Sequence, residues 1–297
     1  MNQIKTIGFV GLGVMGEHMC ANLVRKSGLP VHIFDRSPEA IARVAETGGI
    51  AATSLEAVGA AADAVFLSLP SIDQVETVCE SLLQASPAPA MIVDMSTSDV
   101  ARTRALAASL AAAGIAFVDA PVARTREAAV QGTLFITVGG SADDVEPIRP
   151  FLACMGSDVL HCGAVGCGQI VKILNNITVM MTVNALSEVL TIGRRAGVDG
   201  RELFNALSQG SADSFVLRNH GLKSLVPDSF PEKVFPVDYA IKDAALALSL
   251  ARAGGFEPRI ATYTHDMLCK TRDAGFAPNY HPAVIQLIDG RAGAPRP

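Results

Sequence analysis

Several features that mark other classes of protein are absent from this sequence. The 297 residues carry a net charge of -5, with no basic surplus of the kind that binds nucleic acid. The six cysteines show no C-x-x-C pair and no regular disulfide spacing, which favours reduced cysteines in a cytoplasmic protein. The six histidines are scattered without an H-x-x-x-H pattern, so no metal site is predicted.

A signal peptide and a membrane span are not predicted either. An apolar run, Ile4 to Val10, begins almost at the first methionine, which leaves no room for a signal peptide before it. The most apolar stretch, Ile170 to Ile192, is interrupted by Lys172, Asn176 and Glu188, among other polar residues. An isolated spanning helix tolerates such residues poorly, so we expect a core helix.

The order of the predicted elements indicates two domains. Hydrophobic residues make up 49% of the chain and charged residues 18%, as in helices packed on a parallel sheet. Short apolar strands alternate with helices up to a strand at Val159 to His161, which predicts a doubly wound α/β Rossmann domain over residues 1–163. Beyond it the alternation stops, and we expect an all-helical domain over residues 164–297, entered by one long helix that ends near Arg195.

A dinucleotide fingerprint follows the first strand. The segment GLGVMG, residues Gly11, Leu12, Gly13, Val14, Met15 and Gly16, stands between a strand and a helix, as phosphate binding requires. A second strand, Val31 to Phe34, ends in Asp35, the carboxylate expected to hold the adenosine ribose. Arg36 follows, and a guanidinium can bind a 2'-phosphate, stack on adenine or lie in solvent. We expect NAD, with NADP as the alternative.

Three further strand ends carry candidate residues. Leu69 and Pro70 follow one strand, and Ser96 and Thr97 follow another. These positions fit either the cofactor crevice or ordinary turns and caps. After the third strand come DAPV (Asp119 to Val122) and then Ala123, Arg124 and Thr125, where the arginine is either a solvated surface residue or part of an anion site.

The start of the long helix carries the predicted chemistry. Lys172 and Asn176 are four residues apart and share one helix face, so an ammonium and an amide project side by side. Such a pair can bind and protonate a small polar substrate. In the later helix from Tyr239, Lys242 and Asp243 are conspicuous charges, for which a solvated helix face is the alternative.

In combination the motifs resemble the β-hydroxyacid dehydrogenase family, which includes 3-hydroxyisobutyrate dehydrogenase and tartronate semialdehyde reductase. The resemblance covers nearly the whole chain and depends on GLGVMGEHMCANL (Gly11 to Leu23), DAPV with a later GTL (Gly132 to Leu134), GCGQIVKILNN (Gly166 to Asn176) and KDAALAL (Lys242 to Leu248). It implies that Lys172 is the catalytic acid/base, that Asn176 orients the substrate, that Ser96 or Thr97 lies near the nicotinamide, and that Lys242 closes over the cofactor. The lysine should have its pKa lowered by burial beside the cofactor, because alcohol oxidation needs it neutral.

The chain departs from the family at one place. The family usually has Ser-Gly-Gly after DAPV to hold the substrate carboxylate, and this chain has Ala123-Arg124-Thr125. Arginine offers a bidentate fork, so we expect Arg124 to bind the terminal anion of a short semialdehyde or hydroxy acid. An arginine-threonine pair at this place resembles the sulfolactaldehyde reductase branch. A non-catalytic NAD(P)-binding relative is the rival interpretation. The apolar long helix also predicts a homodimer or homotetramer.

Overall fold

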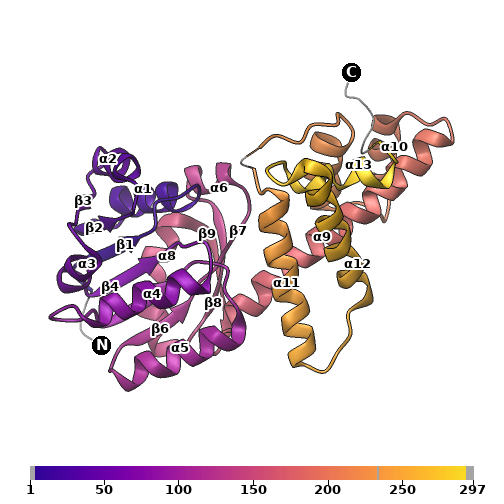
Figure 1. Ribbon diagram of the computed structural model, residues 1–297. Coiled ribbons are helices and arrows are strands. Elements are labelled where there is room, and N and C mark those ends of the chain that lie inside the picture. The colour runs from indigo at the N-terminus through magenta and orange to yellow at the C-terminus, as the bar shows by residue number, and fades with distance from the viewer. Residues whose placement is uncertain (1–3, 233, 292–297) are drawn as a thin grey trace. The chain divides into compact units, whose positions relative to one another are not determined.

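The computed structural model describes residues 4–232 and 234–291. The chain divides into two compact units, Met1–Lys172 and Ile173–Pro297, and each is described by itself. The first unit contains the strands, which are drawn in indigo to magenta in Figure 1, and the second contains helices.

The first unit is built on one sheet with the order β3-β2-β1-β4-β5-β6-β8-β7, and β9 pairs with β8. The strands are β1 (Ile7–Val10), β2 (Val31–Phe34), β3 (Ile50–Ala51), β4 (Ala64–Leu67), β5 (Met91–Asp94), β6 (Ala116–Asp119), β7 (Val122–Ala123), β8 (Leu134–Gly139) and β9 (Gly156–Gly163). From β3 to β6 all neighbouring strands are parallel.

Helices cover both faces of this sheet (Figure 1). They are α1 (Gly16–Lys26), α2 (Pro38–Ala45), α3 (Leu55–Ala61), α4 (Ile72–Leu83), α5 (Val100–Ala112), α6 (Arg126–Gln131), α7 (Ala142–Val145), the 3-10 helix η1 (Glu146–Ile148) and α8 (Arg149–Met155). Alternate strand residues enter opposite cores: Phe9 packs with the core on the α1 face, and Val10 with the core on the α4 face. The predicted Rossmann architecture is confirmed.

The structure differs from the sequence-based expectation at several places in the first unit, among them β9, which was expected at Val159 to His161 and covers Gly156–Gly163. The first strand begins at Ile7, not at Ile4. Between β8 and β9 the chain forms α7, η1 and α8 and not one continuous helix, because Pro147 and Pro150 each stand at the start of a new helical segment. Strand β8 is antiparallel to β6 and β7, since the segment that joins β7 to β8 is too short for the crossover that a parallel neighbour requires.

The second unit is helical, as predicted. Its elements are α9 (Cys167–Arg195, which begins in the first unit), α10 (Gly200–Leu207), the π-helix η2 (Leu217–Leu225), α11 (Val237–Ala253), α12 (Arg259–Thr271), the π-helix η3 (Arg272–Phe276), the 3-10 helix η4 (His281–Val284) and α13 (Ile285–Ile288). Val183, Leu186 and Leu190 of α9 pack in its core. By length and composition α9 could cross a membrane, but 44% of its most apolar window is buried.

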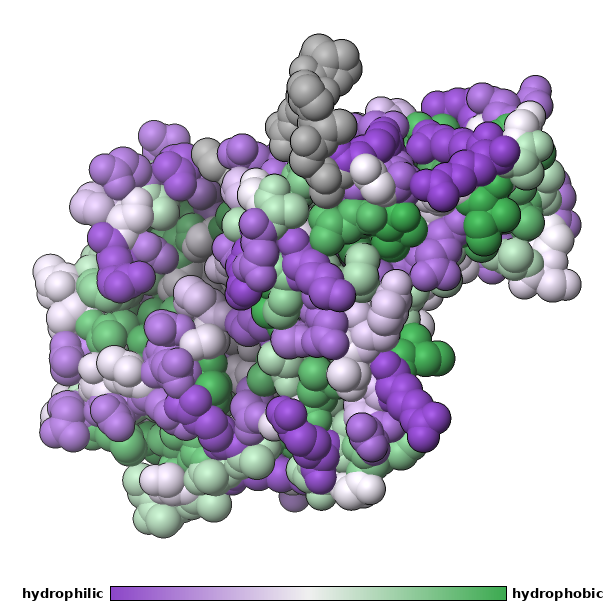
Figure 2. Space-filling model, turned by 45° about the vertical axis from the view of Figure 1, so that its right-hand side comes forward, coloured by the Kyte–Doolittle hydropathy of each residue, from purple (hydrophilic) through white to green (hydrophobic). Residues whose placement is uncertain are grey.

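Apolar side chains also reach the surface of the second unit. Val189 and Ile192 of α9 and Ile260 and Tyr263 of α12 are exposed, Ile192 by 66% and Ile260 by 69%. Tyr263 donates a hydrogen bond to Glu188 at 3.4 Å, so these parts of the two helices are neighbours. Figure 2 shows that hydrophobic patches, in green, interrupt the hydrophilic surface of the molecule.

Candidate active site

The loop between β1 and α1 has the form of a phosphate-binding turn. Gly11 has a φ of +95°, and a Cβ at Gly11 or Gly16 would collide with backbone carbonyl oxygens, those of Ser68 and Gly11 respectively. A Cβ at Gly13 would meet nothing. The outer two glycines are therefore required by close backbone packing, and the middle one leaves open space at the N-terminus of α1, where a phosphate is bound favourably.

Asp35 is held facing this loop. Its Oδ2 accepts a hydrogen bond from the backbone N–H of Leu12 at 2.6 Å, and its Oδ1 accepts one from Ser37 at 2.8 Å. Arg36 is exposed, and within residues 4–232 and 234–291 it makes no ion pair. The two predicted cofactor residues therefore differ: the Asp35 carboxylate is held by backbone hydrogen bonds, whereas Arg36 is exposed.

The loops that follow β4 and β5 are joined by a hydrogen bond. The backbone N–H of Leu69 donates to Ser96 Oγ at 2.9 Å, and the Ser96 N–H donates to Asp94 Oδ1 at 2.9 Å. Ser96 is buried, Thr97 is half-buried and Pro70 is exposed. Both loops belong to the carboxyl edge of the parallel strands, which is where an open α/β sheet binds its ligand.

Gln169 and Asp119, which belong to motifs in the sequence but had no predicted role of their own, join α9 to this edge. Gln169 donates through Nε2 to the Ser96 carbonyl at 2.8 Å, and its Oε1 accepts from the Ser98 N–H at 3.0 Å. Buried Asp119, at the end of β6, accepts from the N–H groups of Gly166 and Gln169 at 2.7 and 2.8 Å. Lys172 follows Gln169 by three residues on α9, so these bonds fix its helix against the cofactor edge.

The buried position of Asp119 gives the stability of the protein a pH dependence. Burial, helped by the neighbouring charge of Asp94, raises the pKa of Asp119 to about 6 against the opposing effect of its backbone hydrogen bonds. The folded protein therefore keeps this proton at pH values where the unfolded chain, with the ordinary aspartate pKa of about 3.8, has lost it. The contribution is complete below pH 3.8 and is lost as the pH rises through about 6.

We expect this contribution, about 3 kcal/mol in the free energy of unfolding, to disappear between about pH 4 and pH 6. Urea titrations at several pH values should show it as a fall in the midpoint with rising pH. In Asp119→Asn, which has no titrating carboxyl at this position, that part of the slope should be missing. Equal slopes in the two proteins would contradict the assignment.

Arg124 lies differently from the expectation that it faces a substrate. Its φ is +86°, in the left-handed region that favours glycine, which the family usually has there. Its Nη1 donates to the Thr133 carbonyl at 2.6 Å and to Ser157 Oγ at 2.8 Å, and its Nη2 pairs with Asp158 at 2.7 Å. A substrate anion would therefore have to compete with Asp158. Ala123 is buried on β7, and the Thr125 side chain caps α6.

In the second unit, Asn176 is buried and held by an acid. Its Nδ2 donates to Asp243 Oδ2 at 2.6 Å, and Asp243, only 3% exposed, also pairs through Oδ1 with Lys242 at 3.1 Å. Lys242 Nζ lies 6.0 Å from the centre of the Tyr239 ring. The solvated-face alternative is wrong for Asp243. Asp243 positions Asn176 through this hydrogen bond. In the sequence, only the two adjacent charges, Lys242 and Asp243, pointed to it.

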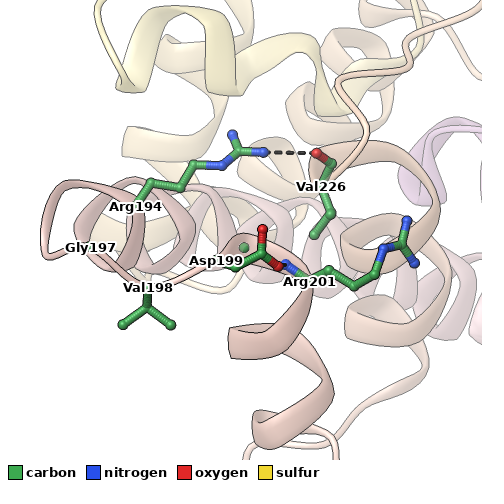
Figure 3. Close-up of a pocket in the computed structure, with 7 residues that line it drawn as sticks. Arg194, Gly197, Val198, Asp199, Arg201 and Val226 are labelled. Carbon is green, nitrogen blue, oxygen red and sulfur yellow. Dashed lines mark hydrogen bonds between the residues drawn. The ribbon is translucent and has the colours of Figure 1, made fainter.

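The cavity in Figure 3 is separate from these groups. It measures about 390 Å³ and lies near the junction of α9 and α10 in the second unit. Two polar side chains that line it form hydrogen bonds with the backbone of other lining residues. Arg194 Nη2 donates to the Val226 carbonyl at 2.8 Å, and the Asp199 carboxylate accepts from the Arg201 N–H at 2.9 Å. None of the predicted site residues lines it.

Comparison with known proteins assigns the two regions. The family model for the NAD binding domain of 6-phosphogluconate dehydrogenase matches residues 6–165. The model for the NAD-binding domain of NADP-dependent 3-hydroxyisobutyrate dehydrogenase matches residues 166–288. A 2-(hydroxymethyl)glutarate dehydrogenase of Eubacterium barkeri is 36% identical over 296 residues, which is 99% of this chain and 98% of the relative. The chain belongs to the β-hydroxyacid dehydrogenase family.

Other members of the β-hydroxyacid dehydrogenase family agree. The mitochondrial 3-hydroxyisobutyrate dehydrogenase of Homo sapiens is 36% identical over 290 residues, 95% of this chain and 86% of the relative. The solved structure of a Mycobacterium tuberculosis 3-hydroxyisobutyrate dehydrogenase with L-serine has a TM-score of 0.87 and 29% identity, covering 96% of this chain and 99% of that one. The protein is accordingly an NAD(P)-dependent hydroxyacid dehydrogenase. The open space at Gly13 and the orientation of Asp35 fit a dinucleotide.

Proposed function

We propose that this protein transfers a hydride between NAD and a short 3-hydroxy acid, or the matching semialdehyde, that carries an anionic group. When bound, the nicotinamide exchanges the hydride with the carbon that bears the oxygen. In the reduction the Lys172 ammonium gives that oxygen its proton and stabilises the negative charge that develops on it. In the oxidation the neutral Lys172 amine takes the proton from the alcohol. Asn176, one turn further along α9, orients the substrate by hydrogen bonding.

The observation that carries the proposal is the attachment of α9 to the cofactor edge. Gln169 binds the loop that contains Ser96 and Ser98, and Asp119 binds the first turn of the same helix. Lys172 is therefore held by a rigid element rather than by a loop, as an acid/base needs to be within hydrogen-bonding reach of the reacting oxygen.

The fixed carboxylate supports NAD over NADP. Each Asp35 oxygen accepts one backbone hydrogen bond and can still accept others from ribose hydroxyl groups. The negative charge of the carboxylate repels a 2'-phosphate. Arg36 and the match of residues 166–288 to an NADP-dependent 3-hydroxyisobutyrate dehydrogenase favour NADP. Initial rates with NADH and NADPH at equal concentration measure this preference, and a higher kcat/KM with NADPH would reverse it.

The experiment that tests the proposed function is a panel of substrates. NAD reduction is followed with 3-hydroxyisobutyrate and 2-(hydroxymethyl)glutarate, and NADH oxidation with short aldehydes bearing carboxylate, sulfonate or phosphate. We expect turnover with at least one carboxylate-bearing compound and none with uncharged aldehydes of the same length. The relative named for 2-(hydroxymethyl)glutarate, which has two carboxylates, supports an anionic substrate. Inactivity with the whole panel would favour a non-catalytic NAD(P)-binding relative.

Arg124 is the residue with which we propose to test recognition of the terminal anion. Replacing it with glycine removes a charge-assisted hydrogen bond, so KM for the best anionic substrate should rise about tenfold with little change in kcat. Asp158→Asn should lower KM, because the ion pair that competes with the substrate is weakened. Arg149→Met, at a half-buried arginine paired with Glu146, is the control.

The same variants test the finer hypothesis of a sulfolactaldehyde reductase. A sulfonate preference in the wild type that is lost in Arg124→Gly would support it. If KM and kcat do not change in Arg124→Gly for any substrate, both the sulfonate hypothesis and the anion role of Arg124 are wrong.

We also propose a homodimer or homotetramer in the cytoplasm, with no nucleic acid or membrane partner. The exposed apolar residues Val189, Ile192, Ile260 and Tyr263 on neighbouring helices support association, because a monomer rarely leaves such a group open to water. Sedimentation velocity should give two or four times the chain mass of 30.9 kDa.

A further inference from the structure

A histidine and an arginine meet beside the phosphate-binding turn. Arg126 Nε donates to His18 Nε2 at 3.1 Å. Arg126 is the first residue of α6, and His18 is the third residue of α1. Asn22, one turn after His18, donates through Nδ2 to the Ala129 carbonyl at 2.8 Å, so α6 is bound alongside α1 and its first residue is held near the start of that helix.

In this pair the positive charge of Arg126 is not neutralised, and some of its hydrogen-bond donors have no partner among the described residues. His18 accepts the bond, so its imidazole is neutral; burial and the charge of Arg126 hold its pKa below the ordinary value. Only Nε of Arg126 is used, and within the described residues its two terminal nitrogens make no hydrogen bond. The nearby acid, Glu17, is already bound by Arg43 at 2.7 and 3.0 Å.

The position of the pair points to an anion. Side chains on a helix lean toward its N-terminus, so His18 lies over the turn that follows Gly13. That turn has the open space at Gly13 that a phosphate needs at a helix N-terminus, and it lies within residues 6–165, which match an NAD-binding domain. We propose that Arg126, aimed by His18, binds a phosphate oxygen of the cofactor's pyrophosphate. Arg126 is then a cofactor-binding residue and His18 a positioning residue. The inference rests on the cofactor-binding part of the proposed function.

Fluorescence titration of the full-length protein with NADH tests the role of Arg126. Arg126→Met should raise the Kd for NADH about tenfold, the effect of one charge-assisted hydrogen bond, while kcat at saturating NADH stays the same. Arg126→Lys should lose less. Arg25→Met is the matched control, because Arg25 is an exposed arginine near the other end of α1, and its Kd should stay within about twofold of the wild type.

Two further measurements separate positioning from general damage to the fold. His18→Ala should weaken NADH binding, and His18→Gln should restore it, because the amide oxygen can accept from Arg126 Nε. Competition by ADP-ribose should weaken in Arg126→Met by the same factor as NADH binding, and competition by adenosine, which has no phosphate, should not change.

The inference is overturned if Arg126→Met binds NADH as the wild type does, or if adenosine competition weakens as much as ADP-ribose competition. A wild type that binds neither NADH nor NADPH overturns the proposed function as well. Normal cofactor binding and turnover in both the wild type and Arg126→Met overturn only the role of Arg126.

Discussion

Replacing Lys172 with alanine should lower kcat by about 10³-fold, within the usual range for losing a general acid/base. The lysine supplies the proton in the reduction, removes it in the oxidation, and places a positive charge where the alkoxide develops. Water in the space left by the side chain has neither the fixed position nor the charge. The Kd for NADH should stay within about twofold, because Lys172 acts on the substrate oxygen.

Stopped-flow and steady-state assays with the best substrate from the panel would measure this loss, and NADH titration would show that the site is intact. Lys223→Ala is the control, because Lys223 is a lysine of η2 whose Nζ bonds only to Asn219 among the described residues. If Lys172→Ala keeps a tenth or more of the wild-type kcat, Lys172 is not the acid/base.

Removal of the Asp243 carboxylate should have the second largest effect on catalysis, after the loss of Lys172. We expect Asp243→Ala to lower kcat/KM by about 100-fold, because misplacing a substrate-binding group by about 1 Å is enough for such a loss. Asn176 would lose its 2.6 Å hydrogen bond and Lys242 its 3.1 Å ion pair, both of which are made to the buried Asp243 carboxylate. Asp243→Asn keeps an acceptor oxygen and should lose less.

A double-mutant cycle would decide whether Asp243 acts through Asn176. Each single alanine variant should cost nearly as much as the double variant, because the two residues form one unit. Losses that simply add would show that Asp243 has no effect on Asn176. Asp238→Ala, at an exposed position on the same helix, is the control, and melting temperatures of all variants would expose any loss of fold.

Local patterns in the sequence were enough for most of the fold. Apolar patterns predicted the strand Val31–Phe34 and the end of the long helix at Arg195, which are the bounds that the structure has. The glycine spacing predicted the turn around Gly13, and the four-residue spacing of Lys172 and Asn176 placed them one turn apart on α9. Such features follow from neighbouring residues, because the periods of helices and strands are short.

The tertiary structure decided the contacts between residues far apart in the chain. Strand β8 pairs antiparallel with β6, and Gln169 donates a hydrogen bond to the Ser96 carbonyl. Asp243 is buried and accepts a hydrogen bond from Asn176, and Arg124 pairs with Asp158. No local pattern fixes these pairs, because each depends on how distant segments are brought together and on which polar groups burial forces to find a partner. The sequence determined which groups are present for the chemistry, and the topology decided which of them hold each other in place.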